Sequence, residues 1–120
     1  MDTRSDEIDA FLPLPAATFH ILVALAGEDR HGYAIIQDIA ARTGDEVQLG
    51  AGTLYRSIQR MLDHGLIAES RERPARELDD ERRRYYRITP LGLAVARAES
   101  RRLSRMLKLA RQSGLVQGKP

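Results

Sequence analysis

Three short segments of the chain place apolar residues at helical spacing, and a glycine follows each segment. These glycines are Gly27, Gly44 and Gly65. A period of about 3.6 residues is that of an amphipathic α-helix, and glycine often ends a helix. We therefore expect helices at residues 15–26, 32–43 and about 50–64, packed around one core. The apolar positions are Phe19, Leu22, Val23, Ala26, Ile35, Ile36, Ile39, Ala40, Leu54, Ile58, Met61 and Leu62.

The stretch after the third helix has the pattern of a β-hairpin. Residues 66–71 and 83–89 are short segments, and the second contains Tyr85, Tyr86 and Ile88, which favour strands. A long charged stretch with Pro74 lies between them and predicts an exposed loop. Because side chains alternate along a strand, one of the two tyrosines is expected to pack inward and the other to lie on the outer face, where it covers the hairpin or faces a binding partner such as DNA. The sequence does not say which is which.

A long final helix follows the hairpin. Thr89 is suited to cap a helix and Pro90 to occupy its first position, and an apolar stripe continues to about Gln112. The order predicts a mainly α fold with a small β-hairpin: a winged helix-turn-helix at residues 13–90, followed by a long C-terminal dimerisation helix at residues 91–112. We expect the acidic residues 1–12 to form a flexible arm and residues 113–120 to form a frayed tail.

Composition excludes several classes of protein. A chain of 120 residues, 42% hydrophobic and 30% charged, fits one globular domain, and the absence of cysteine excludes disulfides and thiolate metal sites. No apolar run approaches the roughly 20 residues of a membrane span, and no signal-peptide pattern opens the chain, so we expect a cytoplasmic protein without a membrane partner. The three histidines are scattered and no phosphate-binding glycine loop is present. We therefore expect no enzyme activity, no metal and no cofactor.

The third helix has a polar outer face. If its apolar stripe faces the core, the opposite side of the helix points outward, and it carries Thr53, Arg56, Arg60 and Asp63. The flanks of this outer side carry Tyr55, Ser57 and Gln59. Two arginines one turn apart, near hydroxyl and amide groups, suit a helix that reads a DNA groove. Gly50, Ala51 and Gly52 add little bulk at the helix start, where backbone N–H groups can approach a phosphate. A simple solvated face has the same pattern, so context must decide.

Five motifs supply that context. They are His31-Gly32-Tyr33, Gly52-Thr53-Leu54-Tyr55, Gly65-Leu66-Ile67, Arg84-Tyr85-Tyr86 and Thr89-Pro90-Leu91-Gly92. In this order they resemble the PadR family of bacterial transcriptional regulators, over about residues 14–92. The resemblance implies a winged helix-turn-helix homodimer that enters the major groove with its third helix, and the family's habit favours repression.

The same resemblance assigns DNA-binding roles. Tyr33, Thr53, Tyr55 and Ser57 would bind phosphate oxygens, and Gly52 would let the backbone approach the DNA. Arg56 is the first choice for a base-edge contact, whereas Arg60 reaches the backbone. Any wing contacts would come from Arg82, Arg83 and Arg84, because the loop before them is more acidic than the family pattern and phosphate would repel it.

The final helix indicates the partner. Its apolar stripe would expose more apolar surface than a monomer normally tolerates, so we expect a second copy to cover it. A twofold dimer predicts an inverted-repeat operator. The basic excess at residues 97–111 either flanks the DNA or solvates the outer face of the helix, and the sequence favours the second. The expected dimer residues are Phe19, Leu91, Val95, Leu103, Met106, Leu107 and Ala110.

Two further functions stay open at this point. A winged helix also serves as a protein-binding module without specific DNA binding, and the acidic loop favours that alternative. PadR relatives can also hold a small-molecule effector between their subunits, in some cases on a tryptophan that this chain lacks. The sequence does not identify the operator, the regulated genes or an effector.

Overall fold

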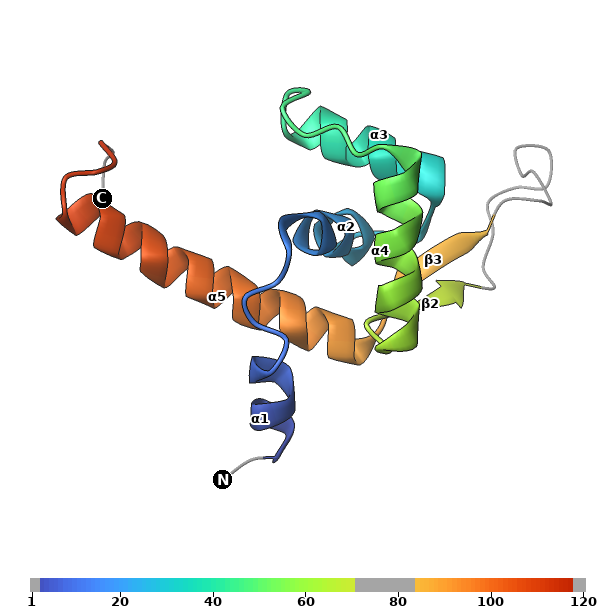
Figure 1. The fold of residues 1–120 in the computed structure, drawn as a ribbon, viewed down its shortest axis with the longest axis horizontal. Helices are drawn as coiled ribbons and strands as arrows, with labels where there is room; N and C mark the ends of the chain where they lie inside the picture. Colours follow the sequence, from blue (N-terminus) through green and yellow to red (C-terminus); the bar gives the residue numbers. More distant parts are fainter. Residues whose placement is uncertain (1–2, 71–83, 118–120) are drawn as a thin grey trace.

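The computed structural model describes residues 3–70 and 84–117 of the chain. Its elements follow one another as a helical fold with a small sheet and a long final helix (Figure 1). They are α1 (Thr3–Asp9), α2 (Ala16–Ala26), β1 (Arg30–His31), α3 (Gly32–Arg42), α4 (Ala51–Asp63), β2 (Ile67–Ser70), β3 (Tyr85–Ile88) and α5 (Pro90–Gln112). The mainly α fold with a long C-terminal helix is the one that the sequence predicted.

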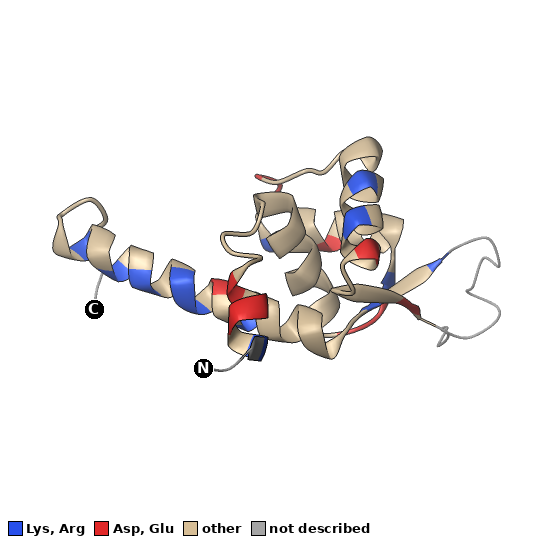
Figure 2. Cartoon of the chain, turned by 60° about the horizontal axis from the view of Figure 1, so that its bottom comes forward, with Lys and Arg blue, Asp and Glu red and all other residues tan. Residues whose placement is uncertain are grey.

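The N-terminal residues differ from the prediction. Instead of a flexible arm, residues 3–9 form α1, which packs against α5 (Figure 2). Ile8 and Phe11 lie partly buried against the core, and the ring of Phe11 meets that of His64 edge-on, with centroids 5.8 Å apart. These few apolar contacts hold the segment in place, although it is too short and polar to show a helical stripe.

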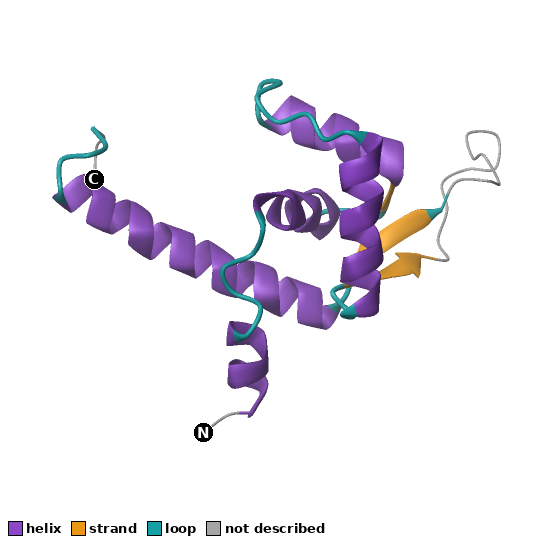
Figure 3. Ribbon diagram, in the orientation of Figure 1, coloured by secondary structure: helices purple, strands orange, loops and turns teal. Residues whose placement is uncertain are grey.

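The sheet has three strands rather than the two expected. Its order is β1-β3-β2, with both pairs antiparallel (Figure 3). Arg30 pairs with Tyr86 and His31 with Tyr85, so the two residues before α3 form a third strand. Two residues carry no period, and their pairing depends on a partner more than fifty residues away in the chain. This added strand connects the start of α3 to the wing.

The core lies around α2, which contacts α3, α4, α5 and β3. The predicted stripes of α3 and α4 supply their part of it. The stripe predicted for α2 is wrong except at Leu22: Ala26 is exposed, and Ile21 and Leu25 enter the core instead. Leu66 and Ile67 follow α4 into this core, and both tyrosines of β3 are buried as well. The most fully buried large side chains are Ile21, Leu22, Leu25, Ile35, Ile39, Leu54, Met61, Ile67 and Val95.

The predicted start of α5 is confirmed. Thr89 is the N-cap, with its hydroxyl accepting from the Gly92 N–H at 3.0 Å, and Pro90 occupies the first helical position. The same hydroxyl donates toward the carbonyl oxygens of Gly65 and Leu66, at 2.6 and 2.9 Å. Thr89 therefore connects the first turn of α5 to the turn that ends α4.

Gly92 brings the two segments into direct contact. A Cβ atom on Gly92 would overlap the carbonyl oxygen of Leu66 and would lie 3.1 Å from a side-chain carbon of Ile88. The main obstacle is backbone, which cannot rotate out of the way. Only glycine fits where α5 crosses the turn after α4.

A buried carboxylate fixes the middle of α5. Glu99 is 2% exposed, and its oxygens accept from the Leu14 N–H at 3.1 Å and from Arg102 at 2.5 and 3.1 Å. The hydrogen bond from Arg102 lowers the pKa of Glu99 against the opposing effect of burial, so the carboxylate stays charged. It holds the segment that joins α1 to α2 against α5.

The contact at Gly92 predicts the result of adding one methyl group. We expect Gly92→Ala to lower the free energy of unfolding by about 1–3 kcal/mol or more, because the methyl group must displace the Leu66 backbone. Urea denaturation at fixed protein concentration measures the change. Gly27→Ala is the matched control, since a Cβ there meets nothing within 4 Å; equal stability of the two variants would contradict the prediction.

Candidate nucleic-acid interface

Helix α4 has a buried face and an open face. Leu54, Ile58 and Met61 are buried, whereas Thr53, Arg56 and Arg60 are exposed. Figure 2 shows two basic bands along this helix, followed by an acidic one near its end. Neither arginine forms an ion pair or hydrogen bond with a residue in the described ranges 3–70 and 84–117, while Gln59 donates to Asp63 at 3.0 Å. Two uncompensated cations therefore lie on the surface of α4.

The start of α4 is open to an anion. Its N-cap, Gly50, provides no side-chain hydrogen bond to the first turn. A Cβ on Gly52 would lie 3.2 Å from Nη1 of Arg56, so the Arg56 guanidinium extends back over this first turn. The N–H groups at a helix start carry partial positive charge. They and the guanidinium present donors that suit a phosphate or the acceptor edge of a base.

Tyr55 connects the two helices of the helix-turn-helix. A Cβ on Gly32 would meet the hydroxyl of Tyr55 and lie 2.9 Å from its Cζ, so the phenol ring rests against the start of α3. Tyr55 is nevertheless 52% exposed, and Tyr33 on α3 is 61% exposed. Burial, and to a smaller extent the neighbouring Tyr55, raises the pKa of Tyr86 in the wing. Tyr55 thus lies where α3, α4 and β3 meet.

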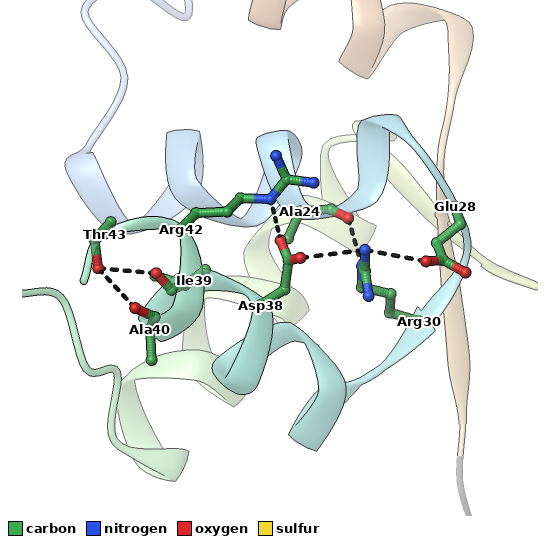
Figure 4. Close-up of polar contacts among 8 residues, drawn as sticks. All are labelled: Ala24, Glu28, Arg30, Asp38, Ile39, Ala40, Arg42 and Thr43. Atoms are coloured by element: carbon green, nitrogen blue, oxygen red, sulfur yellow. Dashed lines mark hydrogen bonds and ion pairs between the residues drawn. The ribbon is translucent and has the colours of Figure 1, made fainter. Parts of the chain in front are cut away.

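A polar cluster connects α3 to the end of α2 (Figure 4). Arg30 donates from Nε to the Ala24 carbonyl at 2.8 Å, and its Nη2 lies 3.2 Å from both Glu28 and Asp38. Asp38 also binds Arg42 at 2.7 Å. The α3 helix is capped at its start by His31, whose Nδ1 accepts from the Ala34 N–H at 3.1 Å. The structural roles of Arg30 and His31 could not be predicted from the sequence. Of the contacts in this cluster, only the Asp38–Arg42 pair has a recognisable sequence signal, its spacing of four residues on one helix.

Most of the predicted DNA-binding residues that the structure describes are exposed. Ser57 is the exception on α4: it is 2% exposed, so its hydroxyl is not available to a phosphate. It lies at the edge of the apolar face, where α2 and α3 pack against α4. Arg82 and Arg83 lie outside the described residues. The exposed members are Tyr33, Gly52, Thr53, Tyr55, Arg56, Arg60 and Arg84.

The two tyrosines of β3 are both buried, contrary to the expected alternation between core and surface. Tyr86 belongs to the core cluster. Tyr85 points to the other face of the sheet, where the ring of His31 covers it edge-on with centroids 5.3 Å apart. The unforeseen strand β1 is the reason, because it brings His31 opposite Tyr85.

Comparison with known proteins identifies the family. Residues 21–98 match the model of the transcriptional regulator PadR-like family. The chain belongs to the PadR-like family of transcriptional regulators. The resemblance found in the sequence motifs is therefore confirmed, and proteins of this family regulate transcription by binding DNA and are not enzymes.

Individual relatives agree with this assignment. Transcriptional regulator Rv3488 of Mycobacterium tuberculosis is 32% identical over 93 residues, which are 78% of this chain and 80% of that protein. An uncharacterized protein of Lysinibacillus sphaericus is 39% identical over 74 residues, or 62% of this chain and 65% of that relative, less than two thirds of its length.

A solved structure shares the fold. The structure of a transcriptional regulator from Clostridium thermocellum matches with a TM-score of 0.67 and 27% identity, covering 90% of this chain and 94% of that one. The winged-helix PadR-like architecture is thereby confirmed. Among the described residues, no helix is long and apolar enough to cross a membrane, and no three acidic or histidine side chains gather as metal ligands would.

The Gly32–Tyr55 contact predicts a coupled pair of substitutions. We expect Gly32→Ala to displace the end of the Tyr55 ring and to lower the free energy of unfolding by less than Gly92→Ala does, because the obstacle is the end of a half-exposed side chain and not backbone. Tyr55→Ala removes the obstacle, so the double variant should lose less stability than the sum of the two single variants. Urea denaturation of all four proteins measures the coupling. The same cycle with Tyr33→Ala is the control and should be additive; additivity in both cycles would contradict the contact.

Proposed function

We propose that this PadR-like regulator is a homodimeric repressor that binds an inverted-repeat operator with α4 in the major groove. The observation that carries the proposal is the open face of α4. There Arg56 and Arg60 lie exposed, without an acidic partner among the described residues, on a helix whose opposite face is anchored in the core. A rigid helix with free arginines is what direct readout of base edges requires.

Each exposed residue has a role in this proposal. Arg56 reads a guanine edge from the first turns of α4, and Arg60 reaches the DNA backbone farther along. Tyr33, Thr53 and Tyr55 bind phosphate oxygens and fix the register of the protein on the duplex. Gly52 allows close approach of the backbone, and Arg84 adds a wing contact beside the sequence-predicted Arg82 and Arg83. Ser57 has no part in binding, because it is buried.

Removing Arg56 tests the base contact. We expect Arg56→Ala to weaken binding to the operator by about 1–3 kcal/mol and to leave binding to a scrambled duplex nearly unchanged. Fluorescence anisotropy at fixed, near-physiological salt measures both affinities, with the upstream intergenic DNA of the gene as the first operator candidate. Arg42→Ala makes the same charge change on an arginine bound to Asp38 and is the control.

Three outcomes of this experiment are distinct. An equal loss on both duplexes would assign Arg56 to phosphate rather than to a base. Unchanged operator binding in Arg56→Ala would contradict the role of α4. Absence of binding to upstream and distant candidate operators would favour the alternative function, a winged-helix module that binds proteins.

The homodimer rests on the second half of α5. Leu103, Met106 and Leu107 are 40, 54 and 41% exposed, and they continue the face on which the first half of α5 packs against α2. In Figure 1 this part of the helix extends away from the rest of the fold. An apolar stripe of this kind is best covered by a second copy of the same helix. Ala110 lies on the same stripe, with Phe19 and Leu91 partly exposed nearer the core.

Val95 is a correction to the predicted dimer surface. It is 0% exposed within the single chain, where it belongs to the core. Val95 does lie on the apolar stripe of α5, but this part of the stripe packs against the core of its own chain. The open part of the stripe beyond Glu99 therefore carries the centre of the proposed interface, and Phe19 and Leu91 lie at its margin.

A charge placed on the stripe tests the dimer. We expect Leu107→Glu to convert the protein from twice the chain mass of 13.5 kDa to a monomer, because a carboxylate cannot be buried there without a partner. Sedimentation equilibrium measures the mass. Gln112→Glu adds the same charge to an exposed position on the other side of α5 and should leave the dimer intact. A monomeric wild-type protein would contradict the proposal.

Two finer parts of the proposal rest on the family alone. Repression is tested by a reporter gene under the operator, whose expression should rise when the protein is deleted. Release by a small-molecule effector between the subunits is tested by adding aromatic compounds to the DNA complex. A cytoplasmic location accompanies the DNA-binding role.

A further inference from the structure

Five basic residues form a line along one side of α5, which we call the α5 basic stripe: Arg97, Arg101, Arg105, Lys108 and Arg111. All five are exposed. At about 100° per residue they lie on the side of the helix opposite Leu103, Met106 and Ala110. Figure 2 shows the resulting series of basic bands along the distal half of the helix.

No acid among residues 3–70 and 84–117 pairs with the stripe. The single acidic residue of α5 is Glu99, which is buried and bound to Arg102 and the Leu14 N–H. The acidic residues Asp6, Glu7 and Asp9 belong to α1, which packs against α5, but they form no ion pair with the stripe. The five charges are therefore uncompensated within the described part of the chain.

The stripe also stays open when the protein dimerises. The proposed dimer covers the side of α5 that carries Leu103, Met106 and Ala110. Four of the five cations lie on the side away from it, and Arg111, one turn after Leu107, lies at its edge. From Arg97 to Arg111 the stripe extends about 21 Å at about 1.5 Å per residue. Over that length one strand of duplex DNA carries about six phosphates. A band of cations, mostly arginine and spaced three or four residues apart, matches such a polyanion in charge and in length.

We propose that the α5 basic stripe is a second DNA-binding surface, which binds duplex phosphates without regard to sequence. It rests on the proposed function, because DNA is the polyanion that the protein meets through α4. A membrane surface would need the apolar side of α5 free as well, and that side is assigned to the dimer. The sequence alone favoured a solvated outer face; the alignment of the cations and their lack of acidic partners favour DNA.

The salt dependence of non-operator binding tests the stripe. The triple variant Arg101→Gln/Arg105→Gln/Lys108→Gln keeps good helix formers and removes three charges. Binding of the dimer to a 40-bp scrambled duplex is measured between 50 and 300 mM salt. We expect the slope of log K against log salt to become shallower by about 2.7 for each stripe that contacts the duplex, at about 0.9 per cation.

A charge-restored variant distinguishes the effect of the stripe cations from the effect of the protein's net charge. Adding Asp6→Asn, Glu7→Gln and Asp9→Asn to the triple variant returns the net charge to +2. We expect its slope to stay as shallow as that of the triple variant. A slope equal to wild type in the triple variant, or a slope recovered by the restored variant, would overturn the proposal.

The α4 function is followed separately in the same proteins. The Arg56→Ala protein should lose its preference for the operator. On scrambled DNA its slope of log K against log salt should stay within about 0.9 of the wild-type slope, the contribution of the one charge removed. If the wild-type protein shows no operator preference but the triple variant still has a shallower salt slope, the proposed function is contradicted and the proposal for the α5 basic stripe is supported. Sedimentation and thermal melting confirm that every variant remains a folded dimer; a stripe variant that lost its slope only by dissociating would count against the proposal.

Discussion

The arrangement of this protein depends on the close contact between Gly92 and the carbonyl of Leu66. No side chain fits between them, and the Thr89 hydroxyl bonds to both sides of the junction. The contact fixes the start of α5 against the turn that ends α4, so the recognition helix and the long C-terminal helix keep one relative orientation. A dimer built through α5 can therefore set the spacing of two α4 helices on DNA.

The helices serve two purposes because each has two chemically different sides. One side of α4 enters the core and the other carries free arginines, so the helix is held rigidly while its functional groups remain accessible. The apolar side of α5 is first a core element, around Val95, and then an open stripe around Leu107. Its opposite side is basic from Arg97 to Arg111. In the proposed function, binding to DNA and binding to a second copy therefore use separate faces and do not compete.

Much of this fold can be predicted from the sequence, and the exceptions have physical reasons. Helical period and the Thr89-Pro90 pair locate four helices closely, because local patterns determine them. The strand Arg30–His31 escapes such reasoning, since its pairing with β3 is long-range. Ser57 and Val95 were assigned to surfaces because a helical wheel gives direction but not how far neighbouring helices reach. The role of Tyr55 against Gly32 became apparent only from the packing of α3 on α4.

The central claim is that the open face of α4 meets DNA. Backbone amide NMR of the isotope-labelled dimer, titrated with the upstream intergenic duplex, tests it most directly. We predict the largest shifts at the first turns of α4, residues 51–56, and at Tyr33, with small shifts in the core-facing part of α2. Shifts confined to other elements, with residues 51–60 unchanged at saturating DNA, would contradict the account.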